Sequence, residues 1–141
     1  MPCKCRTRAT LTTDQAPKAV GPYSLGVRAG HFIYTAGQVG LNPATGTLVE
    51  GGIEAETRQV LNNLKAILEA GGVSLGRVVK TTVYLRDMAD FTRMNGVYAE
   101  FFPAEPPART TLQAAGLPRN GAVVIDAIAL LPEEDCDCGC G

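Results

Sequence analysis

One amphipathic helix is the feature that most restricts how this chain can fold. From about Glu54 to Ala70 the apolar residues recur at steps of one, four, seven and eight, which places them on one side of a helix: Val60, Leu61, Leu64, Ile67 and Leu68. Gly71-Gly72 ends the pattern, because glycine readily takes the left-handed conformation common at helix C-termini. A helix with one apolar face has to bury that face against another layer of the fold.

Segments rich in β-branched and aromatic residues surround this helix and predict strands. They lie at residues 31–36, 78–85, 109–112 and 122–131. A second helix is predicted to begin at Asp87, whose carboxylate can accept backbone N–H bonds, and prolines at 103–107 end it. Its apolar face is Phe91, Met94, Tyr98, Phe101 and Phe102. The order of elements predicts an α+β fold in which two helices pack on one face of a sheet.

The other face of that sheet has no cover from its own chain. Packing it against a copy of itself in a closed symmetric oligomer is the simplest way to bury it. A chain of 141 residues, 45% of them hydrophobic, is enough for one core. We expect one domain over residues 15–131, with flexible tails at 1–14 and 132–141.

The composition argues against two kinds of partner. The longest apolar stretches fall far short of the roughly 20 residues that a membrane-spanning helix needs, so no membrane association is expected. The formal net charge is −1 and no run of Lys or Arg stands out, so a nucleic-acid partner is not favoured. Because no apolar segment follows the polar start at Met1 to Asp14, we expect a cytoplasmic protein.

All five cysteines lie near the two ends, as Cys3-x-Cys5 and Cys136-x-Cys138-x-Cys140. As thiolates they could bind a soft metal, but this spacing is not the C-x-x-C of common zinc sites. Reduced thiols in flexible tails are the favoured alternative, because cytosolic thiols are normally kept reduced. No metal site is therefore predicted, and the soft-metal hypothesis stays open.

Arg109 is the main candidate for ligand binding. The single histidine, His31, offers neither a metal cluster nor a nucleophile–histidine pair. Arg109 starts a predicted strand after an extended proline-rich approach, where a guanidinium can grip a carboxylate with two parallel hydrogen bonds. Pairing with a neighbouring acid is the structural alternative. Asn95 shares a helical face with the aromatic residues of the second helix, so its buried amide needs a partner, which could be backbone or ligand.

Seven segments, in order along about residues 14–131, together resemble the RidA/YjgF imine deaminases (reactive intermediate deaminase A). They are Gly21-Pro22-Tyr23-Ser24, Thr35-Ala36-Gly37-Gln38, Val79-Lys80-Thr81-Thr82-Val83, Asn95 to Phe102, Pro107-Ala108-Arg109-Thr110-Thr111, Leu117-Pro118 and Ile125-Asp126-Ala127-Ile128-Ala129. The resemblance implies a chorismate-mutase-like fold of the bacillus type, with a mixed sheet, and a homotrimer with three clefts at subunit boundaries.

The same resemblance implies an activity and the residues that perform it. The activity is hydrolysis of small 2-imino acids, such as 2-iminobutanoate and 2-iminopropanoate, to 2-keto acids and ammonia without a cofactor. Arg109 would hold the substrate carboxylate, and the backbone of Thr111 and of Gly37 would contact the imine or its attacking water. Tyr23 and Asn95 would line the cleft.

Two positions depart from the family pattern. The family's Glu-Ile-Glu is Val124-Ile125-Asp126 here, and Ala36 stands where the family often has serine. Side chains two residues apart on a strand are separated by roughly 6 to 7 Å, so Asp126 cannot simply replace an acid at Val124. The leading hypothesis is an imine or enamine deaminase, and the alternative is a non-catalytic binder of small keto acids or related carboxylates.

Overall fold

A computed structural model describes residues 7–132, and the parts of the two predicted tails at 1–6 and 133–141 lie outside it. The described chain forms one mixed sheet in the order β1-β2-β3-β7-β5-β6, with the short β4 beside β7. All neighbours are antiparallel except β5 and β6. The strands are β1 Arg8–Leu11, β2 Gly26–Ala29, β3 Phe32–Thr35, β4 Gln38–Val39, β5 Val78–Leu85, β6 Ala108–Gln113 and β7 Val123–Leu130.

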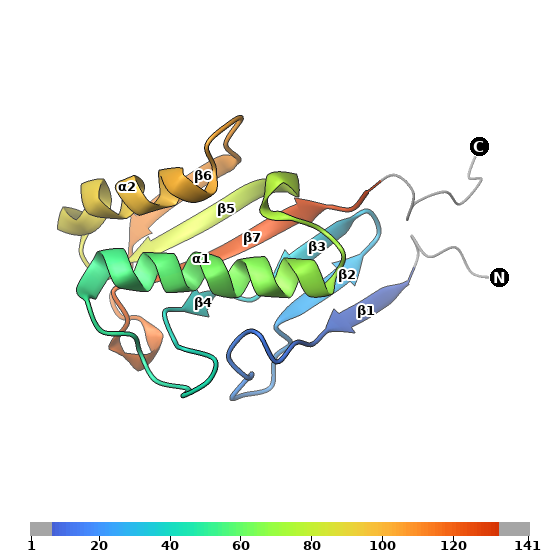
Figure 1. Cartoon of the computed structure of the whole chain (residues 1–141), viewed down its shortest axis with the longest axis horizontal. Coiled ribbons are helices and arrows are strands. Elements are labelled where there is room, and N and C mark those ends of the chain that lie inside the picture. Colours follow the sequence, from blue (N-terminus) through green and yellow to red (C-terminus); the bar gives the residue numbers. More distant parts are fainter. Residues whose placement is uncertain (1–6, 133–141) are drawn as a thin grey trace.

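Two helices, α1 (Gly52–Ala70) and α2 (Phe91–Phe101), pack on the same face of this sheet (Figure 1), which confirms the predicted layout. The apolar stripe of α1 is buried against alternate residues of β5 and β7, including Val83 and Ile125, which are both fully buried. Gly72 follows α1 with a φ of 85°, the left-handed conformation expected there. The apolar periodicity of one helix therefore fixes where the core lies.

Some elements differ from the sequence prediction. Residues 8–11, expected in the N-terminal tail, pair with β2 as the edge strand β1, although their side chains are largely exposed and show no apolar alternation. Asp87 caps a short 3-10 turn at Met88–Asp90, where its side chain accepts the Ala89 N–H, and α2 begins only at Phe91. Edge strands and single turns bury little surface, so they leave a weak hydrophobic signal.

The crossover from β5 through α2 to β6 places the end of the proline-rich segment beside the core. Arg109 pairs with Thr81 and Thr111 with Val83. Since Thr81 and Val83 are buried beneath the helices and cross-strand partners share a face, Arg109 and Thr111 face the helical layer. The alternate residues Thr110 and Leu112 face the uncovered side.

Two buried polar side chains of α1 hold neighbouring loops. Glu56, 4% exposed, accepts the backbone N–H of Ala122 at 2.8 Å, directly before β7. The Asn63 amide donates to the carbonyls of Val39 and Leu41 at 3.2 and 3.0 Å. Among the described residues no helix is both long and apolar enough to cross a membrane.

Candidate functional site

Two aromatic rings of α2 hold the guanidinium of Arg109. Its central carbon lies 4.7 Å from the centroid of the Tyr98 ring and 5.5 Å from that of Phe91. Within residues 7–132, two ion pairs form, Arg58–Glu100 and Arg93–Asp90, and neither involves Arg109. Aromatic faces attract a cation but leave its N–H groups free. The structural alternative, an arginine paired with a neighbouring acid, is therefore absent from this part of the chain.

An apolar cavity of about 370 Å³ opens beside this guanidinium. Its lining comes from α2, the proline-rich segment and the start of β6: Asn95, Tyr98, Ala99, Phe102, Pro106, Pro107 and Arg109. The Oδ1 atom of Asn95 is buried and has no hydrogen-bond partner. A buried acceptor without a partner is costly, so a ligand N–H or water at this atom would stabilise the site.

A buried hydrogen bond fixes the floor of the cavity. The hydroxyl of Tyr98, which is 6% exposed, lies 2.7 Å from the hydroxyl of Thr81 on β5. Burial raises the pKa of Tyr98, while the hydrogen bond to Thr81 and the charge of Arg109 oppose the rise. The phenol therefore stays neutral and holds its ring under the guanidinium, which restricts the directions in which Arg109 can donate.

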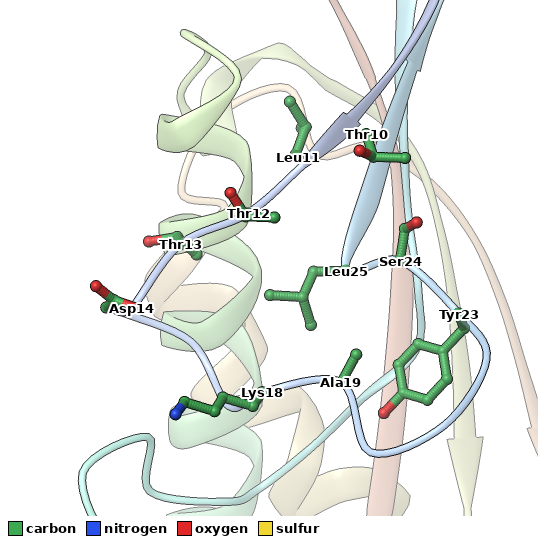
Figure 2. A pocket seen from close by; sticks show the side chains of 10 residues that line it. All are labelled: Thr10, Leu11, Thr12, Thr13, Asp14, Lys18, Ala19, Tyr23, Ser24 and Leu25. Atoms are coloured by element: carbon green, nitrogen blue, oxygen red, sulfur yellow. The ribbon is translucent and has the colours of Figure 1, made fainter.

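The five residues expected at the site fall into separate regions. Arg109 and Asn95 line one cavity, and Thr111 lies two residues further along the same face of β6. Tyr23 instead lines a pocket of about 430 Å³ that the end of β1 and the loop leading to β2 form, with Ser24 and Lys18 (Figure 2). It is 49% exposed, and its hydroxyl accepts the backbone N–H of Val20 at 3.3 Å.

Gly37 lies between β3 and β4, far from Arg109. The strands β4, β7, β5 and β6 are successive neighbours, so Gly37 and Arg109 are separated by three strand spacings, or about 14 Å. A Cβ atom on Gly37 would meet Cγ1 of Val124 at 2.7 Å. Val124 alternates with the core residue Ile125 and therefore faces the side without helices. One small ligand cannot touch Arg109 and Gly37 of the same chain.

Asp126 lies two residues after Val124 on β7 and faces the same side of the sheet, the one without helices. Its register partner is Thr82 on β5, and the hydroxyl of Tyr84 donates to Oδ2 at 3.4 Å. Burial raises the pKa of the Asp126 carboxyl, against the opposing effects of its hydrogen bonds with Tyr84 and Thr82 and of the charge of Lys80. Asp126 therefore holds its negative charge less readily than a solvated aspartate, which makes its carboxylate a better proton acceptor.

The cavity lined by Arg109 and Asn95 can recognise a small molecule that carries both a carboxylate and a nitrogen-bound hydrogen. Arg109 supplies the donors, Asn95 Oδ1 supplies the acceptor and the aromatic rings exclude water. The helical spacing predicted that Asn95, Phe91 and Tyr98 share one face. It did not predict the hydrogen bond by which Thr81 holds Tyr98. Only the strand register could have placed Thr81 beneath Tyr98.

Comparison with known proteins gives a consistent result. A family model described as Endoribonuclease L-PSP matches residues 13–131. A 2-iminobutanoate/2-iminopropanoate deaminase of Mus musculus is 48% identical over 123 residues, covering 87% of this chain and 91% of that protein. The crystal structure of RidA from an Antarctic Psychrobacter has a TM-score of 0.84 and 44% identity, covering 87% of this chain and 99% of that one.

A further solved structure contains a ligand. Escherichia coli TdcF, crystallised with bound serine, has a TM-score of 0.84 and 38% identity, and the match covers 88% of this chain and 99% of that one.

Proposed function

The chain belongs to the endoribonuclease L-PSP family, also called RidA/YjgF, and from this premise we propose that it hydrolyses small 2-imino acids to 2-keto acids and ammonia in the cytosol. Deaminases among its relatives at 44–48% identity support the general enzyme class. The observation that carries the proposal is the unpaired Arg109 guanidinium beside the unpartnered Asn95 Oδ1. Together they fit a carboxylate with a neighbouring imine N–H.

In this proposal Arg109 binds the carboxylate with two hydrogen bonds and Asn95 accepts the imine N–H. Water then adds to the imine carbon, and one of its two protons passes by way of a proton acceptor to the nitrogen, which gives a carbinolamine. The remaining hydroxyl proton passes to the nitrogen as the carbon–nitrogen bond breaks, releasing ammonia and leaving a 2-keto acid. An imine is already electrophilic, so the protein has mainly to orient it, accept a proton and limit access of competing reactants. None of these steps needs a cofactor.

The cleft of the proposal is completed by a second copy of the chain in a homotrimer. Arg109, Asn95 and Thr111 supply one half, and Tyr23 and Gly37 of the neighbouring copy supply the other. The separation of about 14 Å between Arg109 and Gly37 within one chain supports this division. The apolar residues on the uncovered sheet face, which include Tyr34 at 44% and Leu112 at 40% exposure, would be buried by the same assembly.

One observation favours the alternative of a non-catalytic carboxylate binder. A methyl group of Val124 lies 2.7 Å from where a Cβ on Gly37 would be. An apolar side chain, not a carboxylate, therefore stands where the family has its first acid. In the catalytic proposal Asp126, two residues after Val124 on β7, accepts the proton of the attacking water. In the binding alternative the residues around Arg109 bind the carboxylate and no proton acceptor takes part.

An ammonia-release assay on enzymatically generated 2-iminobutanoate tests the proposal. The wild-type protein should accelerate ammonia release above the uncatalysed rate, and Asp126→Asn should remove most of the acceleration while keto-acid binding persists. Glu69→Gln, which changes an exposed carboxylate near the C-terminal end of α1, is the matched control and should keep full activity. A background rate for the wild-type protein with intact keto-acid binding would instead establish the binder.

A further inference from the structure

A second apolar pocket, of about 320 Å³, lies among three loops beside β4 (Figure 1). The loop leading to β2 contributes Tyr23, the segment after β4 contributes residues 41–46 apart from Asn42, and the turn before β7 contributes Arg119. This lining shares no residue with the cavity that contains Arg109. The two hollows are therefore separate, and the proposed subunit cleft meets this pocket through Tyr23.

The walls of the pocket are held in place before any ligand binds. Pro17, Pro43 and Pro118 line it, and the ring of proline fixes the φ angle of its own backbone. The Arg119 Nη2 atom donates to the carbonyl of Gly46 at 2.7 Å, which ties the turn before β7 to the loop after β4. A pocket that is already ordered loses little conformational entropy when a ligand enters it.

A strained turn places Arg119 at this pocket. The φ angles of Arg119 and Asn120 are 60° and 55°, in the left-handed region that non-glycine residues seldom adopt. Two hydrogen bonds hold the turn there: Arg86 Nη1 donates to the Asn120 carbonyl at 2.8 Å, and the Gly121 N–H donates to the Pro118 carbonyl at 3.1 Å. Such strain persists where the surrounding structure enforces it, and it is common at ligand-binding positions.

The charge at the pocket is positive. Lys18 and Arg119 line it, and among the described residues no aspartate or glutamate does. Neither cation takes part in the two ion pairs that form within residues 7–132. A guanidinium carries five N–H donors, so Arg119 keeps donors for a ligand beyond the one that binds Gly46. Exposed apolar surface lies beside these charges, since Val20 is 82% and Tyr23 49% exposed.

From the apolar walls and the two cations we propose that this pocket binds a small carboxylate with an apolar body, such as an aromatic acid. The volume is roughly ten times that of one water molecule in the liquid, which suits a ligand of about ten non-hydrogen atoms. The apolar body lies against the prolines and Leu41, and the carboxylate accepts hydrogen bonds from Arg119. A ligand of this kind covers apolar surface and neutralises a cation in the same site.

Phenylacetate, which has about the right number of atoms, is the probe for this site. Phenylacetamide has nearly the same shape without the charge and serves as its control. Backbone amide chemical shifts of the isotope-labelled full-length protein show where each probe binds. The amides of Leu41 and Gly46 report on this pocket, whereas those of Asn95 and Thr111 report on the cavity at Arg109. The measurement does not use ammonia release, so it stands or falls separately from the proposed reaction.

Three variants separate charge from shape. Arg119→Gln removes the cation, and Ala44→Trp places a large side chain in the pocket while leaving both cations in place. Lys65→Gln removes a cation from the exposed side of α1 and is the matched control.

Phenylacetate should shift the amides of Leu41 and Gly46 with saturation. Phenylacetamide should bind about tenfold more weakly, because hydrogen bonds between charged groups are the stronger ones. Arg119→Gln should weaken phenylacetate binding by about the same factor and Ala44→Trp should abolish it, while Lys65→Gln should stay within about twofold of the wild-type protein. Equal affinities for the two probes would overturn the proposal. So would saturable shifts confined to Asn95 and Thr111, or unchanged amides at the pocket because a neighbouring copy covers it.

Discussion

At the scale of single residues, Arg109 shows how a charged group can be held in place without an acid. The aromatic faces of Tyr98 and Phe91 hold the guanidinium at 4.7 and 5.5 Å from their centroids. The helical spacing of Phe91, Asn95 and Tyr98 allowed their shared face to be predicted from the sequence. The register that places Thr81 under Tyr98 joins residues far apart in the chain, and no local pattern encodes it.

Replacing Arg109 should separate a binding role from a structural one. Arg109→Ala should weaken keto-acid binding by about one to two orders of magnitude, because a bidentate pair with a carboxylate is worth roughly 2 to 3 kcal/mol. Arg109→Lys should restore only part of the loss, since lysine keeps the charge but lacks the planar fork. Calorimetric titration measures both, with Arg58→Ala as an exposed control. Unchanged affinity together with a lower melting temperature would mean that Arg109 is only structural.

The raised pKa of Asp126 predicts a dependence of stability on pH. The folded state holds the Asp126 proton more tightly than the unfolded state does, so the free energy of unfolding falls as pH rises from the ordinary aspartate value through the raised one. Asp126→Asn lacks this ionisation. It should match the wild-type melting temperature in acid and exceed it at neutral pH. A neutral-pH gain of the same size in Asp14→Asn would contradict the assignment to Asp126.

At the scale of elements, the sequence predicts best where burial is periodic. The boundaries of β5 at Val78 and Leu85 agree with the prediction, and α1 ends at Ala70 as expected. The strands β1 and β2 and the two-residue β4 were missed, because β1 is largely exposed, β2 is mostly half-buried and β4 is too short to show alternation. Tertiary pairing, rather than local preference, forms all three.

The hydrogen bond between Glu56 and Ala122 links α1 to the start of β7 and should contribute to stability. Glu56→Ala leaves a buried N–H without a partner, so it should lower the free energy of unfolding by about 1 to 3 kcal/mol. Glu56→Gln keeps an acceptor and should lose less than half as much. Urea unfolding followed by circular dichroism measures both. Equal losses in the two variants would show that packing, not the hydrogen bond, is what matters.

At the scale of the whole molecule, the sheet has helices on one face only. Tyr34, Leu112 and Ile128 lie on the other face, where Tyr34 and Ile128 are direct register partners. The division of the expected site into two regions follows from the order of the strands. The sequence predicted the uncovered face from the count of helices, but only the register shows that Gly37 and Arg109 lie three strand spacings apart in one chain.

Light scattering should therefore find a particle of three times the chain mass at micromolar concentration. Tyr34→Lys places a charge on the uncovered face and should shift the protein towards the monomer, because burying an unpaired charge at an interface is costly. The same variant should lose ammonia release as the assembly dissociates. Arg93→Lys on the exposed side of α2 is the control. A wild-type monomer would remove the basis for a shared cleft.

The strand register places Arg8, at the start of β1, and Leu130, at the end of β7, in one row at the same end of the sheet, which bears on how the chain could be rearranged. Since the first and last strands start and finish at one end of the sheet, a linker of a few residues could join them. New termini could then be opened in the loop at residues 42–51, whose residues are mostly exposed or half-buried. Such circular permutation preserves every strand pairing while changing the order in which the strands are synthesised. The strand pairings themselves therefore do not require that the polypeptide begin at β1.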